Sequence, residues 1–303
     1  MVHSYIKNSL LSLALVFSLS SCHKSASNMD ASGTFEATEV IVSSEANGKI
    51  MQFDIQEGQD LLAGQSLGYI DTVQLDLRKK QLLASIQAAQ TRKPDINAQI
   101  AALQQQITTA KMEKTRVENL LKANAATSKQ LDDVNAQIEV LQKQLHATKT
   151  TLESSSKGIN EESDVLKIQV AQIDDQLQKS YITSPIKGTV LVKYSEQGEL
   201  AMQGKSLFKM ADIENMTLRS YVTADQLAQL KVGQTVDVNA EFGSKDNKAY
   251  KGKVSWISAK AEFTPKTIQT RDERANLVYA VKVSVKNDGN LKIGMYGGIK
   301  FNK

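Results

Sequence analysis

The chain has 303 residues, a formal net charge of +4 and a hydrophobic fraction of 41%. This length suffices for two or three small domains, and the mild charge gives no indication of a nucleic-acid partner, which needs clustered basic residues. The only prolines are Pro94, Pro185 and Pro265, so long uninterrupted elements are expected.

The first residues have the pattern of a bacterial export signal. Lys7 supplies a short basic region, and an apolar stretch of about ten residues follows from Leu10 to Leu19. That stretch is too short to span a bilayer. We therefore predict a signal peptide over residues 1–21, which the mature protein lacks.

The sequence Leu-Ser-Ser-Cys at 19–22 is similar to a bacterial lipobox, in which the cysteine is acylated after the signal is cleaved. Cys22 is the single cysteine of the chain, so no intramolecular disulfide is possible. We predict lipid attachment at Cys22 and a flexible tether over 22–33. The alternative is a plain signal peptide that contains a cysteine by chance.

Two stretches of the sequence repeat one another. In each, three glycines and a leucine are spaced by ten, six and three residues, namely Gly48, Gly58, Gly64 and Leu67, and then Gly188, Gly198, Gly204 and Leu207. The alternating residues between the glycines indicate strands, and the glycines indicate turns, where a positive φ costs them little. The spacing resembles the two halves of a lipoyl-type β-sandwich, predicted over 34–70 with its leading strand and over 181–208.

Lipoyl and biotinyl carriers, which this repeat resembles, carry a modified lysine on the hairpin between their halves. Gln74 occupies that position here, and the biotinyl-like triplet Phe208-Lys209-Met210 lies in the second half instead. A swinging-arm carrier is therefore not expected, and the sequence predicts no cofactor.

Residues 71–180 separate the two halves and predict a helical hairpin. Apolar residues step by three and four along the descending arm, at Leu131, Val134, Ile138, Leu141, Leu145, Thr148 and Leu152. This spacing indicates a left-handed coiled coil. We predict a break at Pro94, with Asp95 just inside the next helix, a second break at 154–158 and the hairpin turn at 122–127. Arms of this length give a rod of about 75 Å, which indicates a spacer or a reaching arm.

After Leu207 the pattern changes to short alternating strands with glycine-rich turns, which is typical of a small β-barrel. We predict this barrel, with a short membrane-proximal remainder, over 209–303. A short helix is expected at 225–230, ended by Gly233, and Trp256 is expected in the barrel core. The predicted fold is α+β and elongated, with a split lipoyl-type β-sandwich, an inserted α-helical coiled-coil hairpin and a small β-barrel.

This order of elements resembles the HlyD-type membrane fusion proteins, from about residue 34 to the end of the chain. The resemblance implies a periplasmic adaptor that connects an inner-membrane exporter, with an ABC-type exporter favoured over a proton-driven pump, to a TolC-like outer-membrane channel. It also implies a homo-oligomer of six protomers. With the lipid anchor, the expected location is the periplasmic face of the cell envelope, with the inner membrane favoured over the outer membrane.

The hairpin tip carries a further part of this resemblance. Arg116, Leu120, Thr127 and Leu131 are similar to the family's tip motif, although Val117 replaces a leucine and Thr127 replaces a serine. The resemblance implies that these four residues meet the outer-membrane channel. The alternative is that Leu120 and Leu131 are ordinary coiled-coil residues that close the hairpin.

The charged segment 262–274 is similar to a barrel segment of fusion proteins that serve ABC-type exporters. The resemblance implies a loop that faces the exporter or the substrate path. The alternative is a solvated loop between two strands.

The sequence contains no catalytic or metal-binding constellation. His3, His23 and His146 are scattered, and no phosphate loop, nucleophile elbow or metal-spaced cluster is present. We therefore expect that the chain is not an enzyme. The rival function is that of an envelope lipoprotein whose coiled coil acts as a tether or scaffold without transport. The split lipoyl halves argue against it, because a tether needs only a coil.

Overall fold

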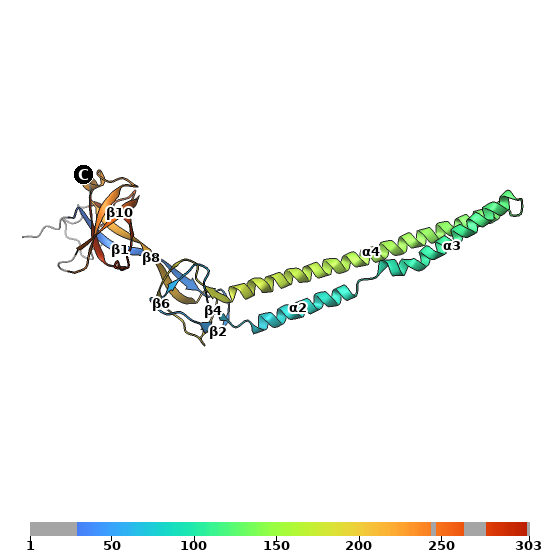
Figure 1. Ribbon diagram of the computed structural model, residues 1–303, viewed down its shortest axis with the longest axis horizontal. Coiled ribbons are helices and arrows are strands. Elements are labelled where there is room, and N and C mark those ends of the chain that lie inside the picture. The colour runs from blue at the N-terminus through green and yellow to red at the C-terminus, as the bar shows by residue number, and fades with distance from the viewer. Residues whose placement is uncertain (1–28, 244–246, 264–276, 302–303) are drawn as a thin grey trace, which may run out of the picture.

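The computed structural model describes residues 29–243, 247–263 and 277–301. They form an elongated molecule in which two β-bodies lie at one end and a long helical hairpin projects from the second (Figure 1). The first and last described segments meet in the β-body farthest from the hairpin, where Asp30 N donates to Ile299 O at 2.9 Å. The hairpin tip is therefore the part of the described chain most distant from the N-terminal strand.

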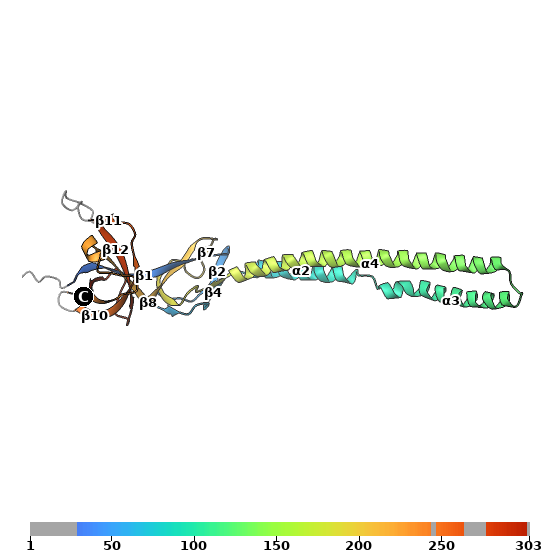
Figure 2. The same ribbon diagram turned by 90° about the horizontal axis from the view of Figure 1, so that it is seen from above.

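Three helices form the hairpin, namely α2 (Val73–Thr91), α3 (Ile96–Lys122) and α4 (Ser128–Lys179). Helices α2 and α3 follow one another along the ascending arm, and α4 returns beside both of them (Figure 2). The 52 residues of α4 span about 78 Å at 1.5 Å per residue. The long hairpin predicted from the heptad spacing is confirmed.

A narrow stripe of side chains joins the two arms. Its buried apolar members are Ala89 on α2, Ile100, Ile107, Ala110 and Val117 on α3, and Ile138 and Ile173 on α4. Other predicted members on α4, such as Leu141 and Leu145, are half-buried. Because one face of each helix is covered, most of the hairpin surface stays exposed.

Pro94 separates α2 from α3, as predicted. Asp95 is the N-cap of α3 and not a residue of its first turn, since its carboxylate accepts a hydrogen bond from Ala98 N at 3.1 Å. Arg92, directly after α2, donates to both carboxylate oxygens of Glu162 at 2.8 and 2.9 Å. The end of α2 is thereby tied to the middle of α4.

The second break, predicted at 154–158, is wrong because α4 is continuous through these residues. Ser156 is 8% exposed and belongs to the stripe between the arms, while Gly158 is exposed. The stripe takes two successive steps of four residues, from Thr148 to Leu152 to Ser156, a change that locally unwinds a coiled coil without breaking its helix. Packing against the ascending arm therefore overrides the weak helix propensity of the serines and the glycine.

The second β-body is built from both halves of the repeat. Its strands are the last part of β1 (Ala31–Ser43), β2 (Gly48–Phe53), β3 (Asp60–Leu61), β4 (Ser66–Ile70), β5 (Tyr181–Thr183), β6 (Gly188–Lys193), β7 (Leu200–Ala201) and the first part of β8 (Ser206–Val222). The halves exchange strands, because Gly48 pairs with Ala201 and Leu61 pairs with Gly188. In the repeat these two pairs are equivalent, so the body has an approximate internal twofold symmetry.

The first β-body is a closed barrel of six strands. In order round the barrel they are β1 (Ala31–Ser43), β8, β12 (Leu277–Lys286), β10 (Asn247–Ile257), β9 (Thr235–Glu241) and β13 (Tyr296–Lys300). The short strand β11 (Glu262–Phe263) pairs antiparallel with the start of β12, and helix α5 (Ala224–Leu227) follows β8. Strands β1 and β8 run through both β-bodies and pair along their lengths. Two continuous strands therefore join the bodies.

Several details of the barrel differ from the prediction. Strand β1 begins at Ala31, so the predicted tether at 22–33 overlaps the first residues of this strand. The first part of β1 also belongs to the barrel, which the prediction placed wholly within 209–303. Trp256 is 43% exposed and is not a core residue, because a bulge after Val254 changes the side that it faces. The short helix ends at Leu227, three residues earlier than predicted.

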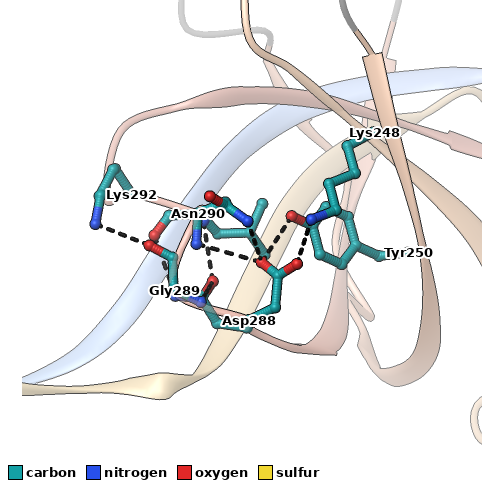
Figure 3. A network of polar contacts seen from close by, with 8 residues as sticks. Lys248, Tyr250, Asp288, Gly289, Asn290 and Lys292 are labelled. Atoms are coloured by element: carbon teal, nitrogen blue, oxygen red, sulfur yellow. Dashed lines mark hydrogen bonds and ion pairs between the residues drawn. The ribbon is translucent and has the colours of Figure 1, made fainter.

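A polar network fixes the loop between β12 and β13 on the outside of the barrel (Figure 3). The Asp288 carboxylate accepts hydrogen bonds from Lys248 Nζ, from Tyr250 Oη at 3.0 Å and from the Asn290 backbone at 3.2 Å. Asn287 joins this loop to β8, since its side chain donates to Ile213 O at 2.8 Å. The loop therefore braces the strand that connects the two β-bodies.

Candidate functional site

The hairpin tip is a compact turn stabilised from both sides. Helix α3 ends at Lys122, and Asn124 takes a positive φ of 55°. Ala125 N then donates to Leu120 O at 2.8 Å, which closes the end of α3. Thr127 begins α4 through a capping box, in which the Thr127 hydroxyl accepts from Gln130 N and the Gln130 side chain accepts from Thr127 N at 2.8 Å.

The four predicted tip residues divide into two pairs. Arg116 and Leu120 lie one turn apart on α3, and both are exposed, with 42% of Leu120 open to solvent. Leu131 is half-buried and belongs to the stripe between the arms, and Thr127 caps α4. Arg116 and Leu120 are thus available to a partner, whereas Leu131 and Thr127 contribute to the hairpin itself.

Met112 was missed by the sequence reasoning. It lies one turn before Arg116 on α3 and is 58% exposed, so Met112, Arg116 and Leu120 follow one another at four-residue intervals. We call these three residues the tip face. The signal was present in the sequence, since all three fall outside the stripe through Ile107, Ala110 and Val117. Met112 was missed because the tip motif begins only at Arg116.

Charge on the tip face is partly balanced within α3. Arg116 Nη1 donates to a Glu113 carboxylate oxygen at 2.6 Å, and the Arg116 side chain is 71% exposed. An exposed pair of this kind holds its members weakly. The guanidinium therefore keeps donors for a carbonyl or carboxylate of a partner.

Residues 1–28, and with them Cys22, lie outside the described part of the chain. The same is true of residues 264–276, which contain most of the charged segment predicted at 262–274. Within the described part, none of the helices combines the length and the apolar character needed to cross a membrane.

The six glycines of the repeat serve two purposes. Five have a positive φ, namely Gly48, Gly58, Gly64, Gly198 and Gly204. Gly188 opens strand β6 with no such φ, but a Cβ there would lie 2.4 Å from Ala211 O. Gly188 is thus required by close strand packing and not by a turn.

Gln74 and Lys209, the two residues compared above with a carrier lysine, have other roles in the structure. Gln74 lies in the first turn of α2. Lys209 lies on β8, and its ammonium donates to Glu39 at 2.9 Å, a hydrogen bond and charge interaction that raise the pKa of Lys209. A lysine held on the sheet in this way differs from one that projects from a mobile hairpin.

Comparison with known proteins identifies the split β-body. The model for the barrel-sandwich hybrid domain of RND membrane fusion proteins matches residues 38–212. The chain belongs to the membrane fusion protein family. Members of this family are adaptors and not enzymes; they face the periplasm, oligomerise and work with inner-membrane transporters and outer-membrane channels.

Several known proteins are similar to this chain in sequence or in fold. The chain is 27% identical over 292 residues to the UPF0194 membrane protein YbhG of Salmonella gallinarum, covering 89% of this chain and 87% of the relative. It is 25% identical over 275 residues to a UPF0194 membrane protein of Yersinia pseudotuberculosis, covering 84% and 83%. The crystal structure of MacA from Actinobacillus actinomycetemcomitans is similar in fold, with a TM-score of 0.52, 20% identity and coverage of 89% and 76%.

Proposed function

We propose that this adaptor couples an inner-membrane exporter to a TolC-like outer-membrane channel, and that the tip face makes the contact with the channel. The observation that carries the proposal is the exposed row Met112, Arg116 and Leu120 at the far end of the hairpin. Two apolar side chains and a cation on a rigid helix suit docking onto another protein. They add little to the hairpin, because all three are exposed and lie outside its buried stripe.

One tip face offers little area, so a single copy should bind the channel weakly. We propose that six copies form a ring and supply avidity, since each later contact is made at high effective concentration. Apolar side chains left exposed along the hairpin support contacts between copies, and they include Leu77, Leu83, Val140, Val165 and Ile168. Crosslinking in cells that contain the exporter tests the ring, and the absence of any species above a monomer would contradict it.

The exporter in this proposal is of the ABC type, and the charged segment 262–274 faces it. The support is the resemblance of this segment to fusion proteins that serve such exporters. Because the matched domain is named for RND membrane fusion proteins, the class of exporter needs its own test. Purification of the adaptor from cells with mild detergent should recover an ATPase and a permease, and recovery of a proton-driven pump would contradict this part.

The anchor in this proposal is an acylated Cys22 in the periplasmic leaflet of the inner membrane. Such an anchor holds the barrel near the exporter and leaves the hairpin free to reach outward over about 78 Å. The rival function, a tether or scaffold without transport, needs the rod but not the tip face.

The test of the whole proposal is export and helicity measured in the same variants. Arg116→Asp and Leu120→Asp should abolish export and leave circular dichroism almost unchanged, because both side chains are exposed and lie outside the buried stripe. Arg78→Asp makes the same charge reversal at an exposed position near the base of the hairpin and should preserve export. Normal export in either tip variant would rule out docking through the tip face.

A further inference from the structure

An aromatic and basic row lies on the outside of the barrel and has no role in the proposed docking. Trp256 on β10 pairs with Lys282 on β12, and Lys282 pairs in turn with Arg219 on β8. The Lys282 ammonium lies 5.6 Å from the centre of the Trp256 indole. Arg219 lies over Tyr221, with its guanidinium carbon 5.8 Å from the centre of that ring. Two cations and two aromatic rings thus lie side by side on one surface.

Among the described residues, Trp256 is exposed and the other three members of the row are half-buried. Trp256 is 43% exposed although it is the single tryptophan of the chain and the largest side chain available for a core. Lys260, in the turn after β10, adds another exposed cation. Two acidic residues are neighbours of Arg219: Glu262 pairs with it at 3.2 Å, and the charge of Glu36 also acts on it. The three cations Lys282, Arg219 and Lys260 outnumber these two carboxylates by one, so the surface keeps a small excess of positive charge.

The row lies beside the first residues of strand β1, close to the N-terminal end of the described chain. Strand β1 begins at Ala31, and its next residue, Ser32, pairs with Tyr221. Cys22 precedes Ala31 by nine residues, 31 minus 22. Nine residues span at most about 32 Å when fully extended. An acyl chain on Cys22 therefore keeps this end of the barrel within about 32 Å of the lipid headgroups.

We infer that the row of Trp256, Lys282, Arg219 and Tyr221 binds the surface of an anionic bilayer, an inference that rests on the acylation of Cys22 in the proposed function. Tryptophan and tyrosine favour the boundary between headgroups and acyl chains, where one side of the ring is apolar and the other is wet. Lysine and arginine beside them attract anionic headgroups. The lipid chain and the basic row then act as two signals that orient the barrel on the membrane.

Trp256 reports on this contact directly, because no other tryptophan contributes to the fluorescence. The full-length acylated protein is reconstituted into phosphatidylcholine vesicles with or without phosphatidylglycerol, and each composition is prepared with and without brominated lipid. We expect a blue shift of the emission and strong quenching in the vesicles that contain phosphatidylglycerol, and weak quenching in the others. Equal quenching in both, or none, would overturn the inference.

Two variants and a control separate the membrane from a protein partner. Lys282→Glu and Lys260→Glu should each lower the partition coefficient of the protein without acyl chains on anionic vesicles by at least about fivefold. One cation near such a surface contributes roughly that factor. Lys260→Glu leaves the contact with the indole in place. Lys129→Glu, an exposed lysine at the hairpin tip, should change nothing. Loss of export with unchanged quenching in the first two variants would mean that the row meets a protein, and the inference would be wrong.

The mass of the purified protein shows whether Cys22 is acylated, so failure of the anchor is distinguished from failure of the row. Protein without acyl chains is mixed with the same vesicles. Quenching restricted to the anionic vesicles would still support the row, and its absence would contradict it.

Discussion

Arg92 donates two hydrogen bonds to Glu162, at the point where α2 gives way to α3 beside an unbroken α4. This ion pair joins the ascending arm to α4 at the place where Pro94 interrupts the helix of the ascending arm. Its side chains are 61% and 50% exposed, so solvent screens much of the attraction. The joint therefore depends more on the cap of α3 than on this ion pair.

We predict that Asp95→Ala destabilises the hairpin more than Arg92→Ala does. Loss of the cap leaves Ala98 N without its acceptor and should cost about 1 kcal/mol. Loss of the exposed ion pair should cost less than about 1 kcal/mol. Urea unfolding followed by circular dichroism measures both, and a larger loss for Arg92→Ala would contradict this ranking.

We predict that Gly158→Ala stabilises the protein by about 0.5–1 kcal/mol. The residue lies within continuous α4, and a Cβ there would meet nothing within 4 Å. Gly188→Ala is the contrasting variant and should destabilise, because its Cβ would approach Ala211 O to 2.4 Å. Thermal unfolding of the two variants measures the difference, and a destabilised Gly158→Ala would indicate that α4 is broken after all.

We predict an acid sensitivity that depends on Asp288. The hydrogen bond from Lys248, helped by those from Asn290 and Tyr250, holds the pKa of the Asp288 carboxyl far below its usual range. A depressed pKa contributes stability above the ordinary carboxyl pKa of about 4, and this contribution is lost as the pH falls below that value. Asp288→Asn should therefore be less stable than the native protein at pH 7.

The stability gap between the two proteins should narrow as the pH falls from about 4 to about 2. Chemical unfolding at each pH measures it. A constant gap over this range would show that the Asp288 charge does not stabilise the barrel loop.

We predict that Cys22→Ala moves the protein into the soluble periplasmic fraction or leaves its signal uncleaved. The reason is that the anchor in this account is an acyl group on that thiol. Cell fractionation and mass spectrometry of the mature N-terminus provide the measurement. An unmodified N-terminus in the native protein would exclude the anchor.

Much of this architecture was predictable because its signals are periodic. The heptad steps from Leu131 to Leu152 required a helix that packs along one stripe, and the repeated glycine spacing required two equivalent β-halves. The break at Pro94 followed from the missing amide hydrogen of proline.

The errors arose where tertiary contacts override local preference. Ser156 lies in a segment with weak helix propensity, yet its burial against the ascending arm keeps α4 intact. Trp256 is large and apolar, as core residues usually are, but a β-bulge turns its side chain outward. The position of a bulge cannot be read from the alternation of apolar and polar residues in a strand. At the tip, Leu131 and Leu120 look alike in sequence, but in the structure Leu131 is half-buried in the stripe and Leu120 is exposed outside it.

The contact between the tip face and an outer-membrane channel is tested most directly by photo-crosslinking in cells, which needs no knowledge of the exported substrate. Benzoylphenylalanine placed at Leu120 should crosslink to the channel, and Arg116→Asp in the same chain should weaken that crosslink. The same probe at Leu83, which is 46% exposed on α2, should give no channel crosslink. No crosslink from Leu120, or an equal one from Leu83, would contradict the account.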